Sequence, residues 1–293
     1  MSTYMREPNE QRRRVNGVEL TYFDWARSPE IQGEPTILLV HATGFHGRCW
    51  DQVIRRLEGR HVIAVDMRGH GRSAKTPPFT WDTFGHDLGE LVEALGLHDT
   101  VAAGHSMGGH SLVTAAAMRP SAFQRLLLVD PVIKAPDDYN KPSPLQDIKE
   151  HPVARRRAIW ESWESMFEHF SAREPFSAWD PAVLADYCRH GLIADEDTDN
   201  LVLACPPTVE ASIYMNALSS NVHGLLPSIR QPVTILRAKL PPIDRAVMDF
   251  SVSPTWPQLA ESFPHAVDVH LPELSHFIPM EQPKLVADYL LDC

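Results

Sequence analysis

The pattern of hydrophobic and polar positions divides the chain into three parts. In the first part, short and wholly apolar runs alternate with segments whose apolar residues recur at helical spacing. Wholly apolar runs of this length are typical of strands buried on both faces of a parallel sheet. We expect four such strands, at 36–40, at 61–65, in the run that begins at 101, and at 125–129.

The segments between these runs predict helices. The clearest spans 83–95, where the apolar positions form one stripe, and similar patterns predict helices at about 50–57 and from 106 to 118. An Asn16-Gly17 pair predicts a tight turn and therefore a hairpin over 12–25. Strands that alternate with helices predict right-handed crossovers and a parallel sheet covered on both faces.

The alternation stops in the middle of the chain. Between 142 and 226 there is no clear buried strand, and the apolar spacing predicts further helices at 153–170, 181–192 and 208–218. Helices inserted between two halves of a sheet domain lie over the edge where ligands bind, so we expect a lid. Its aromatic residues Trp160, Trp163 and Phe167 are candidates for lining an apolar pocket beneath it.

Sheet-like patterning returns after this insertion. Strands are expected at 232–236 and 266–271, and helices at 256–263 and 281–291. The pattern therefore predicts an α/β fold with a doubly wound, mostly parallel sheet of eight strands. The core is expected in two parts, 1–133 and 228–293, with a helical cap at 134–227 between them.

Composition narrows the possible partners. With 293 residues, 43% of them hydrophobic, the chain can build a large core, and a net charge of -11 argues against binding nucleic acid or anionic membranes. No apolar run is long enough to span a membrane, and the polar first residues lack a secretory signal, so a cytoplasmic location is expected. The cysteines are widely spaced, which predicts ordinary thiols at Cys49, Cys188, Cys205 and Cys293.

The candidate chemistry centres on the sequence Gly104-His105-Ser106-Met107-Gly108, which fits the pattern G-x-S-x-G. A sharp strand-to-helix turn brings the flanking backbone so close that only glycine fits two residues away on either side. Such a turn projects the serine hydroxyl from the end of the sheet and leaves the first helical N–H groups unpaired. We therefore predict that Ser106 is a nucleophile.

A serine nucleophile needs a base within hydrogen-bond reach, and His276 is the best candidate. It follows the last predicted strand, in a short loop before the final helix, which places it at the same sheet edge as Ser106. His105 is adjacent to Ser106 and would point away from it. His41 is expected to shape a neighbouring loop.

Together these motifs resemble the α/β-hydrolase superfamily. The family pattern occurs in order as His41-Ala42-Thr43-Gly44, Asp66-Met67-Arg68-Gly69-His70-Gly71-Arg72-Ser73, the Ser106 motif and Ser275-His276-Phe277. The resemblance implies an oxyanion hole formed by the backbone N–H groups of Met107 and Thr43, with Gly44 as an alternative to Thr43. Ala42 departs from the glycine that is usual in the family.

The acid that orients His276 is left open. The family usually places it after the strand at 232–236, yet the residues there contain no acid until Asp244, with Asp249 further on. Asp130 directly follows the predicted strand at 125–129, and some members of the fold use an acid at that place. We favour Asp130, with Asp244 as the main alternative and Asp249 behind it.

The sequence thus predicts a serine hydrolase that cleaves carboxylic esters through an acyl-enzyme intermediate, with no metal or organic cofactor. The expected partner is a small-molecule ester with an apolar group, and the chain is expected to be a monomer or a homodimer. Alternatives are a carbon–carbon bond hydrolase of a ring-cleavage product, a lactonase, and a catalytically silent binding protein of the same fold. The run Arg155-Arg156-Arg157 is interpreted as a solvated helix face.

Overall fold

An eight-stranded sheet forms the core of the computed structural model, which describes residues 7–57, 59–141, 145, 147–195, 197–242 and 249–292. The strand order is β1-β2-β4-β3-β5-β6-β10-β11. The pairs β1–β2 and β2–β4 are antiparallel and all the others are parallel, as expected for a hairpin joined to a parallel sheet. The bounds are β1 Asn9–Val15, β2 Val18–Trp25, β3 Ile37–Val40, β4 Val62–Val65, β5 Thr100–His105, β6 Phe123–Val129, β10 Val233–Arg237 and β11 Ala266–His270.

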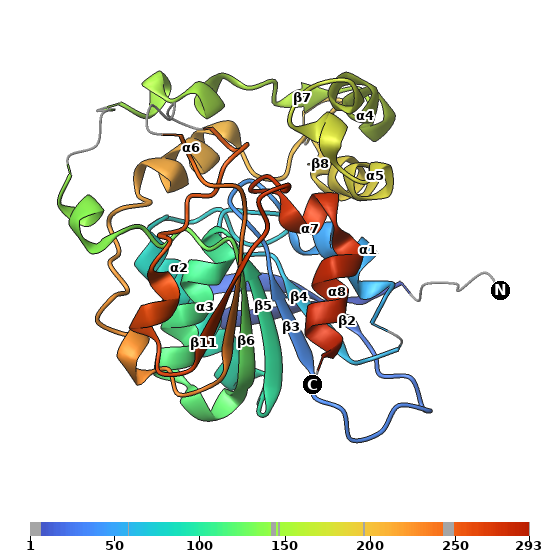
Figure 1. Cartoon of the computed structure of the whole chain (residues 1–293). Helices are drawn as coiled ribbons and strands as arrows, with labels where there is room; N and C mark the ends of the chain where they lie inside the picture. The colour runs from blue at the N-terminus through green and yellow to red at the C-terminus, as the bar shows by residue number, and fades with distance from the viewer. Residues whose placement is uncertain are drawn as a thin grey trace.

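Helices cover both faces of this sheet (Figure 1). Leu38 and Leu39 of β3 show why: successive residues of a strand point to opposite faces, and both side chains are fully buried. Leu38 belongs to the apolar cluster that includes α2 and α3, and Leu39 to the cluster that includes α1 and α8. The covering helices are α1 Asp51–Ile54, α2 Trp81–Ala94, α3 Met107–Met118, α7 Ile278–Glu281 and α8 Pro283–Leu291.

Several expected helices are shorter than the apolar pattern predicts. The helix expected at 50–57 is a 3-10 turn followed by the four residues of α1, and the one expected at 256–263 is only a 3-10 turn. The last helix is divided before Pro283, because proline has no N–H to continue a helix but fits the first turn of a new one. The 3-10 turns are η1 Gly47–Trp50, η2 Pro120–Ala122, η3 Pro136–Asn140, η4 Ile148–Glu150, η5 Pro152–Arg155, η6 Phe176–Ala178, η7 Leu226–Ser228 and η8 Leu259–Ser262.

The inserted segment lies beyond one end of the sheet (Figure 1). It contains α4 Trp163–Ser171, α5 Pro181–His190 and α6 Pro207–Met215, and also three short strands: β7 Ile159–Trp160, β8 Leu192–Ala194 and β9 Leu201–Leu203. These strands form a small antiparallel sheet in the order β7-β9-β8. The insertion contains the expected helices together with a small sheet that the apolar pattern did not predict. The boundaries of the cap at 134 and 227 stay a prediction.

The helix expected at 153–170 is replaced by a strand followed by a shorter helix. Trp160 pairs with Leu201 across β7 and β9, and the side chain of Ser162 then accepts a hydrogen bond from the Ser165 N–H at the start of α4. A serine at this position satisfies one of the unpaired N–H groups of a first helical turn. Apolar residues before and after Ser162 give one continuous helix-like pattern. This pattern explains why the sequence predicts a single helix over 153–170.

Two other expectations can be compared with the described residues. None of the helices described here has the length and apolar character needed to cross a bilayer. Cys49, Cys188 and Cys205 are buried free thiols, which agrees with the expectation of ordinary cysteines, whereas Cys293 lies outside the described residues.

Candidate active site

Ser106 occupies the sharp turn between β5 and α3. Its backbone has φ 58° and ψ -116°, and the residue is 5% exposed. A Cβ atom on Gly104 would lie 2.4 Å from the carbonyl oxygen of Gly108, and one on Gly108 would lie 2.3 Å from that of Val40. The close backbone approach expected from the motif is confirmed, and it excludes any side chain at these two positions.

His276 lies between Ser106 and Asp130, in the turn that joins β11 to α7. Its Nε2 atom is 3.0 Å from Ser106 Oγ, and its Nδ1 atom is 2.7 Å from Asp130 Oδ2. A neutral imidazole that donates from Nδ1 to the carboxylate presents its Nε2 lone pair to the serine hydroxyl. The three side chains predicted at the sheet edge therefore form one hydrogen-bonded chain, with Asp130 at the far end.

Asp130 is held by both of its carboxylate oxygens. It follows β6 with a positive φ of 43° and is fully buried. Its Oδ1 atom accepts hydrogen bonds from Ala238 N at 3.0 Å, Ser253 Oγ at 2.5 Å and Thr255 Oγ1 at 3.3 Å. These donors leave Oδ2 directed at His276, so the carboxylate is fixed before any substrate arrives.

The other candidate acids are placed differently. Asp249 accepts hydrogen bonds from the N–H and the hydroxyl of Ser251, at 2.9 and 2.6 Å. Asp244 lies outside the described residues. At the end of β10, where the resemblance leads one to expect an acid, Arg237 donates to Asp268 from Nε at 3.0 Å and from an Nη atom at 2.8 Å.

Two further histidines support the loops around Ser106. The Nε2 atom of His105 is 2.8 Å from the carbonyl oxygen of His276, so this ring contacts the backbone of the proposed base. His41 accepts a hydrogen bond from Met67 N at 3.0 Å through Nε2, and its Nδ1 donates to Ala42 O at 2.7 Å. Burial lowers the pKa of His41, so a neutral ring fixes the loop that carries Thr43.

The predicted oxyanion donors lie at the same edge of the sheet. Met107 is the first residue of α3, where helix geometry leaves the N–H groups without intrahelical partners. Thr43 and Gly44 follow β3, and Gly44 has a positive φ of 81°. N–H groups in these positions can donate hydrogen bonds to an oxygen on which negative charge develops. Their role in catalysis stays a prediction.

A cavity of about 500 Å³ lies between the cap and the sheet edge. Phe250 contributes to its wall and stacks on His276, with ring centroids 6.1 Å apart, so one residue of the cavity wall packs against the base. Among the predicted lid aromatics, Trp160 lines it. Trp163 and Phe167 are half-buried in the aromatic cluster of the cap and are absent from the described lining, and Arg189 stacks on Trp163. Half of the described lining residues have phenyl, phenol or indole rings: Phe45, Trp160, Phe170, Phe176, Tyr187, Tyr214, Phe250 and Phe277.

Arg156 contradicts the interpretation of its basic run as a solvated helix face. It follows η5 and lines the cavity, where it donates one hydrogen bond to Glu210 Oε2 at 2.7 Å and another to the Tyr187 hydroxyl at 2.9 Å. Three separate cap segments meet in these contacts. Sequence reasoning missed Glu210, because nothing local in the sequence links it to an arginine 54 positions earlier.

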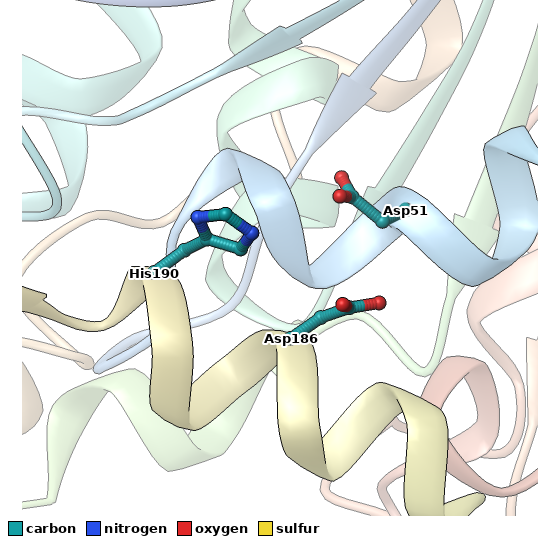
Figure 2. Close-up of side chains that lie close together, drawn as sticks. All are labelled: Asp51, Asp186 and His190. Carbon is teal, nitrogen blue, oxygen red and sulfur yellow. The ribbon is translucent and has the colours of Figure 1, made fainter. Parts of the chain in front are cut away.

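A group of possible metal ligands lies where α5 contacts α1. The ligand atoms of Asp51, Asp186 and His190 all lie within 4.8 Å of one another (Figure 2). Asp51 already accepts hydrogen bonds from Arg48 at 2.7 to 3.0 Å, and Asp186 accepts one from Gln52 at 2.6 Å. A metal ion would have to compete with Arg48 for Asp51. The contacts that the structure shows here instead join the cap to the core.

Known proteins with curated descriptions match part of the chain. Lipase LipV of Mycobacterium tuberculosis is 35% identical over 101 residues, which is 34% of this chain and 39% of the lipase. Non-heme chloroperoxidase CPO-A1 of Kitasatospora aureofaciens is 31% identical over 170 residues, 55% of this chain and 59% of its own length. The chain thus spans less than two thirds of either relative.

Solved structures match nearly the whole chain at lower identity. E-2-(acetamidomethylene)succinate hydrolase superposes with a TM-score of 0.74 at 19% identity, and 97% of each chain is covered. The peroxisomal alpha-beta-hydrolase Lpx1 of Saccharomyces cerevisiae also gives a TM-score of 0.74, at 17% identity, covering 97% of this chain and 88% of that one. At such identities the likeness concerns the fold alone.

The sequence model of the alpha/beta hydrolase family matches residues 37–289. The matched region runs from β3 into α8 and includes the hydrogen-bonded side chains of Ser106, Asp130 and His276. The chain belongs to the alpha/beta hydrolase family.

Proposed function

We propose that the protein is a serine hydrolase that cleaves carboxylic esters through an acyl-enzyme intermediate. The observation that carries this proposal is the buried chain of hydrogen bonds from Ser106 through His276 to Asp130. A serine next to a neutral imidazole, itself held by a carboxylate, is the arrangement needed for nucleophilic attack on an acyl carbon. The match to lipase LipV supports an ester as the substrate.

In the proposed reaction, Ser106 Oγ attacks the ester carbonyl while its proton passes to His276 Nε2. Asp130 keeps Nδ1 protonated and stabilises the imidazolium that forms. The N–H groups of Met107 and Thr43 bind the oxyanion. His276 then gives its proton to the departing alkoxide, and afterwards removes a proton from the water that hydrolyses the acyl-enzyme.

The shape and charge of the cavity favour an ester over the carbon–carbon hydrolase alternative. That alternative needs a cation to hold the carboxylate of a ring-cleavage product. Of the two guanidinium groups in the described cavity wall, Arg156 pairs with Glu210 and Arg157 with Glu161. The surrounding aromatic rings suit a substrate with an apolar group.

The nucleophile is tested by labelling the protein with a fluorophosphonate and measuring turnover of p-nitrophenyl esters. We expect Ser106→Ala to abolish labelling and to lower kcat by about a thousandfold or more. Labelling or turnover that survives this substitution would remove Ser106 from the mechanism.

The acid is tested by comparing Asp130→Asn with Asp244→Asn and Asp249→Asn. Replacing Asp130 allows the wrong imidazole tautomer, so kcat should fall by about a thousandfold or more with little change in KM. The other two variants test the alternative acids and serve as controls for the loss of a carboxylate. Loss of turnover in a folded Asp244→Asn variant alone would assign the acid to Asp244.

A further inference from the structure

Glu210 places a buried carboxylate on the cavity wall beside the predicted oxyanion loop. The residue belongs to α6 and is 4% exposed. A Cβ atom on Gly44 would lie only 2.3 Å from Glu210 Oε1, so this oxygen rests directly against the backbone that follows Thr43. The glycine at 44 is needed both for its positive φ and for the space that the carboxylate occupies.

Arg156 makes a carboxylate tolerable at this place. An uncompensated negative charge here would oppose the negative charge that develops on the substrate oxygen. The hydrogen bond of 2.7 Å from Arg156 to Glu210 Oε2 pairs the two charges, and the Tyr187 hydroxyl holds the guanidinium from its other side. The wall therefore presents a polar pair with no net charge.

The pair has bonding capacity that the described residues do not use. Glu210 Oε1 accepts no hydrogen bond within the described part of the chain, and Arg156 directs only two of its five N–H groups to protein partners there. A carboxylate oxygen on a cavity wall that has no protein donor can gain a hydrogen bond from a bound ligand. Since both residues line the cavity, a ligand in the cavity can supply what is missing.

We propose that the Arg156–Glu210 pair binds a neutral group of the substrate that both donates and accepts hydrogen bonds, with a carboxamide as the best fit. The amide N–H would donate to Glu210 Oε1 and the amide oxygen would accept from Arg156. Glu210 disfavours a substrate carboxylate and Arg156 disfavours an ammonium group, so a neutral group is selected. This inference rests on the proposed ester hydrolysis at Ser106 and defines its substrate class as amide-bearing esters.

The test compares two esters that differ in one group. The p-nitrophenyl esters of N-benzoylglycine and of 4-oxo-4-phenylbutanoic acid carry an N–H and a CH₂ at the same position. The measured quantity is the ratio of their kcat/KM values, corrected for hydrolysis in the presence of Ser106→Ala. Differences in intrinsic reactivity cancel when this ratio is compared between proteins.

The variant is Arg156→Met with Glu210→Met, because a buried ion pair can often be replaced by apolar side chains of similar size. We expect the ratio to fall by about tenfold or more relative to the unmodified protein, as for the loss of a hydrogen bond to a charged group. The matched control is Arg119→Met with Glu93→Met. This ion pair of the same residue types lies outside the cavity lining, and its loss should leave the ratio unchanged.

An unchanged ratio in the double variant would overturn the proposal. A higher kcat/KM of the unmodified protein for p-nitrophenyl hydrogen glutarate, which carries a carboxylate, than for the N-benzoylglycine ester would also overturn it. Should the double variant not fold, inhibition of the unmodified protein decides: N-ethylbenzamide should inhibit about fivefold or more tightly than butyrophenone, which has a CH₂ in place of the amide N–H, and equal inhibition would overturn the proposal. Turnover of both esters by Ser106→Ala would instead contradict the proposed function. If neither ester is hydrolysed, calorimetric titration of Ser106→Ala with N-ethylbenzamide and with butyrophenone replaces the kinetic comparison.

Discussion

At the scale of single residues, the hydroxyl of Ser253 holds the carboxylate of the proposed acid, Asp130, in position. It donates to Asp130 Oδ1 at 2.5 Å, and Asp130 Oδ2 in turn contacts His276. A hydrogen bond to a charged group contributes about 1.5 to 3 kcal/mol. Ser253 is therefore expected to act as a positioning residue that keeps the carboxylate aligned with the imidazole.

We expect Ser253→Ala to lower kcat about tenfold while KM changes little, since the hydroxyl touches the acid and not the substrate. The pH dependence of kcat should shift as well, because the carboxylate that stabilises the imidazolium loses a donor. Ser251→Ala is the matched control, since that hydroxyl bonds to Asp249. Equal kinetics in the two variants would assign Ser253 a structural role only.

At this scale, the sequence predicted the positions of the candidate side chains that come after strands. Ser106, Asp130 and His276 each come directly after a strand or shortly beyond one, and the carboxyl ends of parallel strands meet at one edge. Glu210 and Arg156 have no such marker. They belong to cap segments whose mutual placement depends on tertiary packing, so their pairing became visible only in the structure.

At the scale of elements, the beginning of α5 depends on Asp180. The Asp180 side chain accepts a hydrogen bond from Ala182 N at 2.8 Å, and its own N–H donates to Met280 O at 2.9 Å, next to the end of α7. The first contact caps the helix, and the second joins the cap to the core. α5 also carries Tyr187, which holds Arg156.

Removing this capping side chain with Asp180→Ala should cost the helix about 1 kcal/mol. Amide hydrogen exchange in 181–190 should then become about fivefold faster, while exchange in the central strands stays slow. Asp180→Asn is the control, because asparagine caps helices about as well as aspartate. If both variants exchange alike, the side chain does not act as a cap.

The strands of the main sheet were easier to predict than the cap elements. A wholly apolar run such as 36–40 fits only a buried strand or a short helix, and its flanking turns decide for a strand. Within 153–170 the aromatic residues pack around each other in the cap rather than against one sheet face. Their spacing imitates a long helix, although the chain turns at Ser162.

At the scale of the whole molecule, the stability is expected to depend on buried neutral histidines. Burial lowers the pKa of His110 to about 4, and that of His46 likewise. In the unfolded chain a histidine has a pKa near 6.5. Below that pH the unfolded state binds protons that the native state does not bind, so the stability present above pH ~6.5 is lost as the pH falls toward ~4.

His110→Phe isolates this effect, since buried carboxyl groups such as Glu210, whose pKa is raised by burial, act in the opposite direction. The free energy of unfolding of the unmodified protein, minus that of the variant, should decrease by up to about 3 kcal/mol between pH 7 and pH 4. Urea unfolding at several pH values measures it. A difference that stays constant with pH would contradict a neutral, buried His110.

The position of Asp130 after β6 also affects the order in which the candidate site forms during translation. Nucleophile and acid follow the two strands of one strand–helix–strand unit, β5-α3-β6, and are only 24 positions apart in the sequence. His276 is translated 146 positions after Asp130. A nascent chain can therefore form the serine turn before it contains either the base or the residues Ala238, Ser253 and Thr255 that hold Asp130. The ribosome would carry a fully formed but unreactive serine until the last strand has joined the sheet edge.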